Sequence, residues 1–558
     1  MICTLYKYIT VLAIFLCITL DIRERKPEDM MARSKMKKII VLILTMAMLF
    51  SFTACGNNVD VQPPTDQVIV AMGPNSEPEA GFDPAYGWGA GEHVHEPLIQ
   101  STLTVTTADL EIGYDLATDV QVSDDGLLWT VTIRDDAYFT DGEKLTASDV
   151  AFTYNTVKEK STVNDFTMLD ETVATSETTV EFHMNKPYSI WPYSMAIVGI
   201  VPEHAYDENY GQNPIGSGRY ILKQWDKGQQ IILEANPDYY GGVSEMKRVI
   251  IVFMGEDAAF AAAKAGQVDV AYTAATYSQQ QIKGYSLVSM QSVDNRGINL
   301  PAVMARKTAD GVMTGNDITA DTAVRHAINL GIDRELLIQN VLNGYGSPAY
   351  SVCDGMPWYY DGAEVEYDFD KAVMLLEQAG WIPGDDGIRV RETDGLRAEF
   401  NILYPAGDSV RQAIAAEVSN QLRLLGIETT YEGVGWDTAY DRAQAEPLIW
   451  GWGAHTPMEL YNIYHTNKED GFPEYSPYVD ERVDEYMDMA LSSNDTEEAN
   501  ELWQKAQELI STQSPWVWLV NIDHLYFVRD GLHIAKQKIH PHGHGWSLVN
   551  NVDQWNWQ

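Results

Sequence analysis

Residues 399–431 read EFNILYPAGDSVRQAIAAEVSNQLRLLGIETTY, and this stretch decides the class of the fold. The apolar run at 399–404 predicts a strand, and residues 408–425, followed by Gly426, predict a helix. Residues 427–431 predict a second strand. A unit of this kind needs a right-handed crossover, which leaves its two strands largely parallel in one sheet. Alternating strands and helices are typical of α/β or α+β proteins, and this stretch favours the α/β class.

The rest of the chain alternates short apolar strands with helices in the same way. Residues 129–133 alternate polar and apolar side chains, which is typical of a strand exposed on one face. Thr146 and Asp149 have the spacing of a capping box and predict the start of a helix. The Ala-rich residues 257–265 predict another helix, with Gly266 as its left-handed cap. No stretch repeats with a fixed period, which disfavours a solenoid or a propeller.

The composition excludes several classes of partner. The chain has 558 residues, with 38 Lys and Arg against 80 Asp and Glu, and a formal net charge of −42. Nucleic acid is therefore not an expected partner, and charge alone would not hold the chain on an anionic membrane. Hydrophobic residues make up 45% of the chain, which is enough for the cores of more than one domain. No disulfide framework or zinc spacing can be built from the four cysteines, which are Cys3, Cys17, Cys55 and Cys353.

Residues 1–54 are expected to form a leader. Residues 39–52 are an apolar run that is too short to span a bilayer, and a basic start precedes it. Residues 52–55 (FTAC) resemble the lipobox of bacterial lipoproteins, in which the cysteine is lipidated and becomes the first residue of the mature chain. We therefore expect Cys55 to be the site of lipid attachment. An ordinary cleaved secretory signal is the alternative.

Within this leader, residues 36–54 are the expected lipoprotein signal peptide. Residues 1–30 have no role in such a leader, so we expect the true translation start to be Met30, Met31 or Met36. Residues 55–66 are polar and contain two prolines, which predicts a tether between the lipid and the folded part. The expected location is outside the cytoplasm, anchored to the cell membrane.

Histidines form two groups in the exported part. His93 stands close to His95 and is kept as a candidate ligand contact, while His540, His542 and His544 alternate near the C-terminus. Alternate residues of an extended chain share a face, so these three imidazoles are candidate ligands of one metal ion. Capping and hydrogen bonding are the alternative roles. No Cys pair, HExxH motif or carboxylate-rich loop indicates a structural metal site, so no resident cofactor is expected.

Six segments together carry a resemblance to a known family, although no single segment is specific. They are residues 122–150, 213–242, 265–270, 324–344, 367–381 and 451–454. In this order they resemble the bacterial extracellular solute-binding proteins of family 5, the substrate-binding lipoproteins of peptide, opine and nickel ABC importers. The resemblance implies a two-lobed periplasmic-binding-protein-like fold of class II, in its large type with an extra inserted subdomain.

The resemblance also implies a division of the chain. Two chain crossings near residues 292–296 and 519–523 would join the lobes, and the ligand would be enclosed between them by hinge closure. The expected parts are lobe I at 67–292 plus 520–558, an inserted subdomain at about 102–212, and lobe II at 293–519.

One motif of the family bears on the ligand. In peptide-binding members a Trp-x-Ala-Asp segment places its aspartate against the amino group of the peptide. Here Trp452, Gly453 and Ala454 are followed by His455, so the usual carboxylate partner of an ammonium group is missing. Nickel-binding members share the tryptophan and place a histidine in the following loop, which makes His455 and His465 candidate metal ligands. Surface or hydrogen-bonding roles are the alternative for both.

Other side chains near the expected crossings are candidates to hold a ligand. Arg296, next to Asn295, is our first candidate to clamp a ligand carboxylate, and Arg442 is the second. A solvated salt bridge is the alternative for each arginine. Trp88 and Trp452 are expected to close on the apolar surface of the ligand, unless they only pack in the core.

The resemblance implies a receptor and not an enzyme. Such a receptor captures a small solute and delivers it to ABC permease subunits, whose ATPases supply the energy because this chain has no phosphate loop. A peptide or peptide-like solute is expected, and a nickel or other metal chelate is the main alternative. A secreted glycoside hydrolase with paired carboxylates is a distant alternative. We expect a monomer that meets the membrane only through its lipid.

Overall fold

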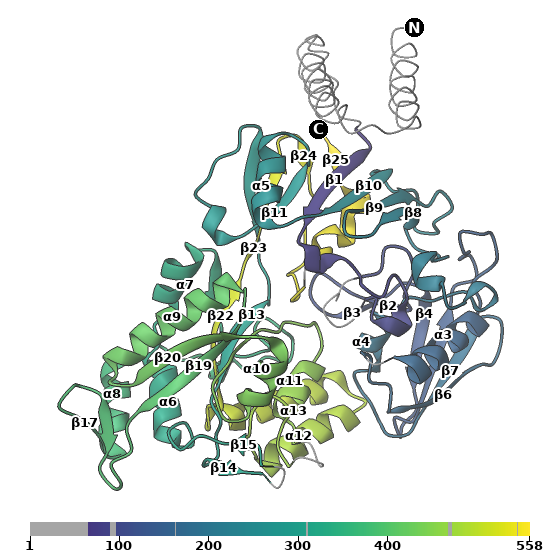
Figure 1. The fold of residues 1–558 in the computed structure, drawn as a ribbon. Helices are drawn as coiled ribbons and strands as arrows, with labels where there is room; N and C mark the ends of the chain where they lie inside the picture. The colour runs from purple at the N-terminus through teal and green to yellow at the C-terminus, as the bar shows by residue number, and fades with distance from the viewer. Residues whose placement is uncertain (1–64, 90–95, 162, 309–310, 467–470, 544) are drawn as a thin grey trace, which may run out of the picture. The chain divides into compact units, whose positions relative to one another are not determined.

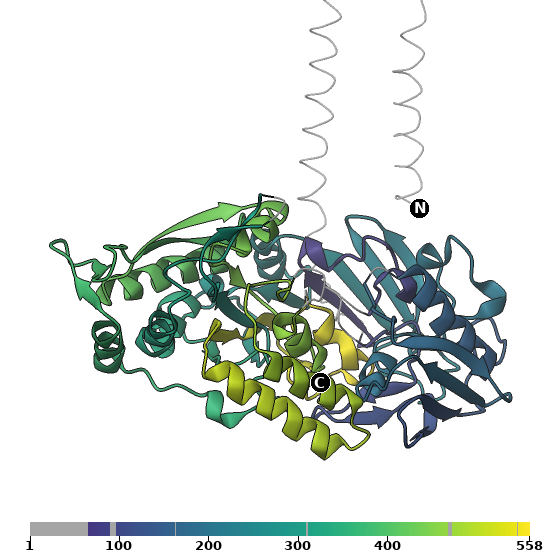
Figure 2. The ribbon, with the colours of Figure 1, turned by 90° about the horizontal axis from the view of Figure 1, so that it is seen from below.

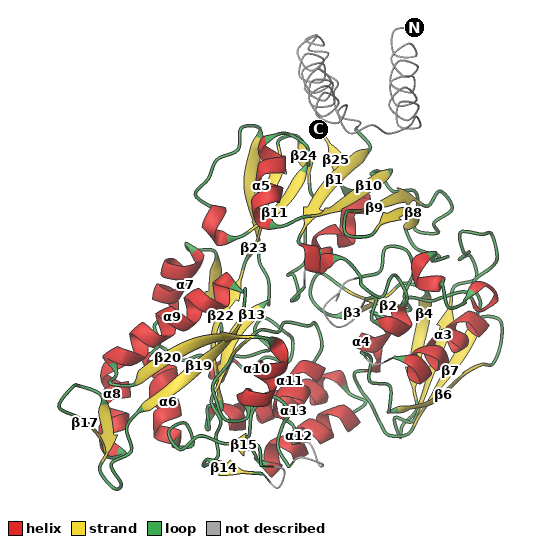
Figure 3. Cartoon of the chain, viewed as in Figure 1, coloured by secondary structure: helices red, strands yellow, loops and turns green. Residues whose placement is uncertain are grey.

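The computed structural model describes residues 65–89, 96–161, 163–308, 311–466, 471–543 and 545–558. Cys55, His93 and His544 lie outside these residues, as do the predicted leader and most of the tether. Helices and strands alternate along most of the described chain (Figure 3). No helix within the described residues has both the length and the apolar character needed to cross a membrane.

A seven-stranded sheet has the first strand of the described chain at its centre (Figure 1). β1 (Gln67–Met72) is parallel to β10 (Arg248–Phe253) on one side and to β11 (Val270–Thr273) on the other. Small side chains let the helix α5 (Glu256–Lys264) pack closely, with Ala259 and Ala263 against Ala71 and Ala271. The remaining strands are β12 (Tyr285–Met290), β23 (His524–Arg529), β9 (Gln230–Ala235) and β8 (Tyr220–Asp226).

A second group of strands is built around β22 (Trp516–Ile522), which is buried along almost its whole length. It pairs antiparallel with β13 (Asn295–Asn299) and β16 (Gly346–Pro348), and β13 also pairs with β21 (Ile449–Trp450). A bridge between Leu403 and Leu448 brings β19 (Glu399–Pro405) beside β21. β20 (Glu428–Val434) lies parallel to β19.

Helices cover this second group of strands, as the view from below also shows (Figure 2). Val324, Leu337 and Ile414 come from three of these helices and share one apolar core with residues of β19 and β22. The helices are α6 (Thr322–Gly331), α7 (Arg334–Leu342), α8 (Phe369–Gln378), α9 (Ser409–Leu424), α10 (Trp436–Ala443), α11 (Met458–Tyr464), α12 (Glu481–Ser492) and α13 (Thr496–Ser511).

An antiparallel four-stranded sheet lies in the segment where the inserted subdomain is expected. Its order is β4 (Ala117–Val122), β5 (Leu128–Ile133), β7 (Thr179–Met184) and β6 (Leu169–Ala174). The helix α3 (Ala147–Lys160) packs on it through Tyr154, whose ring lies 4.9 Å from that of Phe182. α4 (Trp191–Met195) adds Trp191 to the same core.

Four two-stranded pairs complete the strands. They are β2 (Thr104–Thr106) with β3 (Ile112–Tyr114), β14 (Arg306–Lys307) with β15 (Met313–Thr314), β17 (Trp381–Pro383) with β18 (Arg389–Arg391), and β24 (Leu532–His533) with β25 (Asn556–Trp557). The chain passes twice between the first two groups of strands. Residues 291–294 join β12 to β13, and Asp523 joins β22 to β23. The lobe boundaries given above stay a prediction.

Local sequence signals account for many element boundaries. The predicted strand, helix and strand of residues 399–431 are confirmed as β19, α9 and the parallel β20. The capping box of α3 is present: the Thr146 side chain accepts from the backbone amide of Asp149, and the Asp149 carboxylate accepts from the backbone amide of Thr146 at 2.9 Å. Gly266 follows α5 at a φ of +68°, as the sequence predicts for a left-handed cap.

Gly216 is constrained by close packing of its backbone and not by the conformation of a turn. Its φ is not positive, yet a Cβ atom at this position would lie 2.0 Å from the carbonyl oxygen of Ile99. Gly218 is similar, with the Leu98 carbonyl oxygen at 2.5 Å. The segment before β8 is therefore pressed against residues 98–99, and glycine is needed for close backbone approach.

We predict that Gly216→Ala lowers the free energy of unfolding by roughly 1–3 kcal/mol, because backbone atoms cannot move aside as a side chain can. Urea unfolding followed by tryptophan fluorescence measures the loss. Gly73→Ala is the matched control, since a Cβ atom there meets nothing within 4 Å. Equal stability of the two variants would contradict the assignment of Gly216 to close backbone packing.

Candidate functional site

A cleft of about 620 Å³ lies at the carboxyl ends of β1, β10, β11 and β19. The segments that follow these four strands line it, together with residues of both chain crossings. Ligands of open α/β sheets bind at the carboxyl edge of the strands, because the loops there are free to vary while the sheet holds them in place. This cleft is therefore the leading candidate site.

Two arginines meet in this cleft. A Cβ atom added at Gly451 would lie 2.6 Å from Arg296 Nη1 and 2.7 Å from Arg411 Nη2, so the two guanidinium groups approach one point. Arg296 comes from β13 and Arg411 from the first turn of α9. The two residues are 7% and 8% exposed, and neither Nε atom has a hydrogen-bond partner among the described residues.

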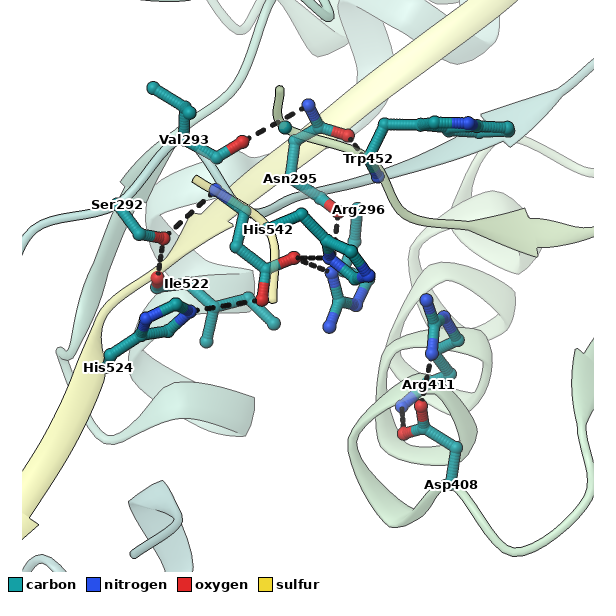
Figure 4. Close-up of polar contacts among 12 residues, drawn as sticks. Ser292, Val293, Asn295, Arg296, Asp408, Arg411, Trp452, Ile522, His524 and His542 are labelled. Atoms are coloured by element: carbon teal, nitrogen blue, oxygen red, sulfur yellow. Dashed lines mark hydrogen bonds and ion pairs between the residues drawn. The ribbon is translucent and has the colours of Figure 1, made fainter. Parts of the chain in front are cut away.

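Each arginine already has one carboxylate partner (Figure 4). Arg411 donates from Nη1 and from its backbone N–H to Asp408, at 2.5 and 2.8 Å. Arg296 Nη1 donates to Asp294 and, at 2.7 Å, to the carbonyl of Asn295. Burial, followed by the charge of Arg296, lowers the pKa of Arg411 to about 10. A carboxylate placed near both groups would relieve their mutual repulsion.

Trp436 supplies an apolar surface in the same cleft. It is the first residue of α10, it is 45% exposed, and its ring lies 5.8 Å from the Arg411 guanidinium carbon. An exposed indole beside a cation can stack on an aromatic or apolar part of a ligand. The cleft thus combines cationic donors with an aromatic wall.

Asp294 connects the cleft to both chain crossings. Its Oδ1 lies 2.5 Å from His542 Nδ1, and its Oδ2 lies 3.3 Å from His524 Nε2. Burial alone would raise the pKa of Asp294, but the Arg296 and His542 charges and the hydrogen bonds from both histidines hold it well below its usual value. Asp294 precedes β13, and His524 begins β23, so one carboxylate ties the two crossings and the C-terminal segment together (Figure 4).

A second cavity of about 300 Å³ lies beside the Trp-Gly-Ala-His segment. His455 lines it with a buried Nε2 that has no partner among the described residues. Burial, helped by the charge of Lys538, lowers the pKa of His455 to about 3, so this imidazole is neutral. Glu459 also lines the cavity, where burial raises its pKa to about 7 despite hydrogen bonds from the amides of Gly453 and Ala454.

The family model described as "Bacterial extracellular solute-binding proteins, family 5 Middle" matches residues 111–474. The chain belongs to family 5 of the bacterial extracellular solute-binding proteins. Protein XP55 of Streptomyces lividans is 32% identical over 484 residues, which cover 83% of this chain and 85% of the relative. The oligopeptide-binding protein AppA of Bacillus subtilis is 27% identical over 449 residues, covering 76% and 81%.

Solved structures of the family have the same fold. NikZ of Campylobacter jejuni, in complex with Ni(L-His), matches with a TM-score of 0.70 at 23% identity over 88% of this chain and all of that chain. The predicted α/β, periplasmic-binding-protein-like fold is confirmed. As a member of this family the chain is a solute-binding protein and not an enzyme. The glycoside hydrolase alternative is thereby excluded.

The structure of this family-5 chain brings some of the predicted site residues together. Arg296 lines the cleft, as does His542. Asn295 is bound to the backbone of Trp452. The backbone N–H of Asn295 donates to the Trp452 carbonyl at 2.9 Å, and the side-chain Oδ1 of Asn295 accepts from the Trp452 backbone N–H at 3.2 Å. Gly453 is required where it stands, because a side chain would meet the carbonyl oxygen of Val293 at 2.3 Å.

Other predicted residues lie away from the cleft lining. Arg442 is held on α10 by Glu446 at 2.7 Å and Glu432 at 2.9 Å, which is the salt-bridge alternative given for it. Trp88 is 2% exposed and packs in the core of the first sheet, with the rings of Phe82 and Trp546 at 4.7 and 5.0 Å.

Trp452 is half-buried in a cluster of aromatic rings. Its ring centroid lies 5.2 Å from those of Trp450 and Tyr475 and 5.3 Å from that of Trp516. The residue is not part of the lining of the 620 Å³ cleft. Its contacts in this conformation are thus those of a packing residue.

Among the predicted metal ligands that the structure describes, His540, His542 and His465 lie against other polar side chains, whereas His455 has a buried Nε2 without a partner. His540 Nδ1 lies 3.2 Å from His524 Nδ1, and burial keeps the pKa of His540 well below its usual value. His465 stacks on Tyr461 at 4.1 Å, and its Nε2 lies 3.3 Å from Asp488. Within the described ranges, no group of three His, Cys, Asp or Glu side chains is arranged to hold a metal ion.

Sequence analysis missed Arg411, Asp408 and Trp436. A signal for the first two was available: they open the helix that follows a predicted parallel strand, and that strand end is where α/β proteins bind ligands. Trp436 stands at the corresponding position after β20.

We predict that Asp294→Asn lowers the free energy of unfolding at pH 7 by roughly 3–5 kcal/mol, because it leaves Arg296 buried without a charge partner. The pKa of Asp294 is lower in the folded chain than in the unfolded one. Its stabilising contribution is therefore complete above about pH 4 and is lost as the pH falls further. Urea unfolding at pH 7, 4 and 3 should show the gap between wild type and variant closing at acid pH.

Asp136→Asn is the matched control for this prediction. Asp136 pairs with Arg134 at the same two-residue spacing, but its side chain is 61% exposed. We expect this variant to have nearly wild-type stability at every pH. A gap for Asp294→Asn that stays constant from pH 7 to pH 3 would contradict the proposed charge pairing.

Proposed function

We propose that the chain captures a peptide or peptide-like solute in the 620 Å³ cleft and holds the ligand carboxylate beside Arg296 and Arg411. The observation that carries this proposal is the meeting of two buried guanidinium groups at the carboxyl edge of parallel strands. Each guanidinium group donates to one aspartate, and its buried Nε has no hydrogen-bond partner among the described residues. A carboxylate is the group that best matches such donors.

The names of relatives support a peptide. AppA of Bacillus subtilis is named as oligopeptide-binding. Its structure in complex with a nonapeptide matches 89% of the present chain with a TM-score of 0.67. The cleft also offers acceptors for a peptide ammonium group, because the carboxylates of Glu256 and Asp523 line it. They can supply the negative charge of the family's aspartate, which the neutral imidazole of His455 lacks.

Delivery and anchoring belong to the same proposal. The two lobes would close on the ligand about the crossings at residues 291–294 and Asp523, and the closed form would dock on the permease. Cys55 would carry the lipid that keeps the receptor near its permease. The nickel-chelate alternative is less favoured, because His540, His542 and His465 lie against His524, Asp294 and Asp488. His455 keeps a buried Nε2 without a partner among the described residues, but it lines the 300 Å³ cavity and not the cleft.

We predict that Arg411→Gln weakens the binding of oligopeptides with a free C-terminal carboxylate about 10- to 100-fold, the usual range for losing a hydrogen bond to a charged group. Isothermal titration of a pool of tri- to nonapeptides, with free or amidated C-termini, measures this loss. Wild type should prefer the free carboxylate, and Arg411→Gln should have lost that preference. Arg442→Gln is the control, because Arg442 is paired with glutamates outside the cleft lining.

Two outcomes would contradict the peptide proposal. One is equal affinity of wild type for free and amidated peptides, which would mean that no carboxylate is held by the arginines. The other is a rise in melting temperature with nickel and free histidine but with no peptide of the pool. The second result would favour the metal-chelate alternative instead.

Cys55→Ser tests the lipid anchor. We predict that wild type expressed from Met36 in a Gram-positive host incorporates labelled palmitate and sediments with membranes, whereas Cys55→Ser does neither. Cys353→Ser is the control, because Cys353 is buried and its thiol is shielded from modification. Release of unlabelled wild-type protein into the medium would indicate an ordinary secretory signal.

A further inference from the structure

Trp436 is an aromatic side chain of the cleft that remains open to a ligand. It lines the 620 Å³ cleft and is 45% exposed, although an indole ring gains free energy when it is buried. Tryptophan in such a position is typical of a contact that a bound molecule completes. The nature of the group that stacks on Trp436 therefore bears on which peptides the cleft selects.

Neighbouring rings hold the indole of Trp436 in place. The ring of Trp450, which is 2% exposed, lies 6.0 Å away, and the ring of Tyr440, one turn further along α10, also lies at 6.0 Å. Trp450 is itself fixed by a hydrogen bond from its Nε1 to Asn299 Oδ1 at 3.2 Å. A ring that is already fixed loses little conformational entropy when a ligand binds to it.

The loop at residues 405–407 makes the surroundings of this indole apolar. Pro405, Ala406 and Gly407 line the cleft and carry no polar side chain. The Ala406 N–H donates to the Val434 carbonyl at 2.8 Å, which places this loop beside the end of β20, the strand that leads into α10. A ligand side chain that reaches Trp436 here leaves water for largely apolar surroundings.

The same indole lies next to a group that is proposed to hold the ligand carboxylate. The Arg411 guanidinium carbon is 5.8 Å from the centroid of the Trp436 ring. Aromatic rings stack with their centroids roughly 4.5–7 Å apart. The last side chain of a peptide is attached to the carbon that carries the carboxylate, so a ring there can reach Trp436 while the carboxylate stays at Arg411. The preceding side chain of an extended peptide points to the opposite side.

We infer that Trp436 selects peptides whose last residue is aromatic, by stacking on that ring while Arg296 and Arg411 hold the carboxylate. This inference rests on the proposed function, because the bound carboxylate sets the position of the ring. It narrows the substrate class from oligopeptides in general to those with a C-terminal phenylalanine, tyrosine or tryptophan.

Four tripeptides test this selection: Ala-Ala-Phe, Ala-Ala-cyclohexylalanine, Ala-Ala-Ala and Ala-Phe-Ala. Isothermal titration at pH 7 measures their affinities for the mature chain. We expect Ala-Ala-Phe to bind about 10- to 100-fold more tightly than Ala-Ala-Ala, through burial of the ring. It should bind about 2- to 13-fold more tightly than the cyclohexylalanine peptide, which buries a similar apolar area but has no aromatic ring. Ala-Phe-Ala should bind more weakly than Ala-Ala-Phe, because its ring points away from Trp436.

Three variants assign the effect to one residue. Trp436→Leu keeps an apolar side chain but removes the ring, so the preference for Ala-Ala-Phe over the cyclohexylalanine peptide should fall to about one. Trp436→Phe keeps a ring and should keep a preference. Tyr431→Leu is the matched control, since Tyr431 is also 45% exposed and belongs to β20, but it does not line the cleft. It should keep the wild-type preference.

Any of five results would overturn the inference. For wild type, they are equal affinity for Ala-Ala-Phe and the cyclohexylalanine peptide, and binding of Ala-Phe-Ala as tight as that of Ala-Ala-Phe. For the variants, they are a preference that persists in Trp436→Leu, one that is lost in Trp436→Phe, and one that is lost in Tyr431→Leu. The proposed function would stand in each case, because peptides still bind.

A lack of binding also separates the two proposals. If peptides of the wider tri- to nonapeptide pool bind but none of the four tripeptides does, the inference alone fails. If no peptide of either set binds, the proposed function fails and the inference fails with it.

Discussion

The arrangement around the cleft depends on one buried carboxylate, that of Asp294. Three cationic or hydrogen-bonding side chains converge on it: Arg296 in β13, His524 at the start of β23, and His542 in the C-terminal segment. A charge this far from water is tolerated only when its partners replace the lost hydration. Asp294 therefore constrains both chain crossings at once, and it sets the position of the guanidinium group that lines the cleft.

This shared carboxylate links closure to recognition. A hinge can move only if the contacts across it have two arrangements of similar free energy. At the crossings, the Ser292 hydroxyl also donates to the Ile522 carbonyl and accepts from the Asp294 amide. A ligand carboxylate beside Arg296 and Arg411 would share their donors with Asp294 and Asp408. Binding would thereby redistribute hydrogen bonds at the same residues that join the two groups of strands.

Local signals in the sequence predict the helices and strands but not the tertiary contacts between them. The Thr146 capping box and Gly266 depend on contacts within a few residues, and the strand pair of residues 399–431 is formed within one short stretch of chain; each is found as predicted. The start of a helix after a parallel strand marks Arg411 as a candidate, but its approach to Arg296, more than 100 residues away in the chain, follows only from the folded structure. Trp88 was selected for its residue type, yet its neighbour Trp546 comes from the far end of the chain. Burial of that kind is set by tertiary contacts, which no local pattern contains.

The net charge of −42 limits which solutes such a cleft can hold. Exposed carboxylates repel an anion over about one Debye length, roughly 8 Å at physiological ionic strength, so the field outside the cleft opposes an anionic solute. Inside the cleft, Arg296 and Arg411 are each balanced by an aspartate, and Glu256 and Asp523 add further negative charge. A free carboxylate alone would gain little there. A zwitterion meets donors at one end and acceptors at the other without a net electrostatic penalty, and this favours a peptide over a simple organic anion.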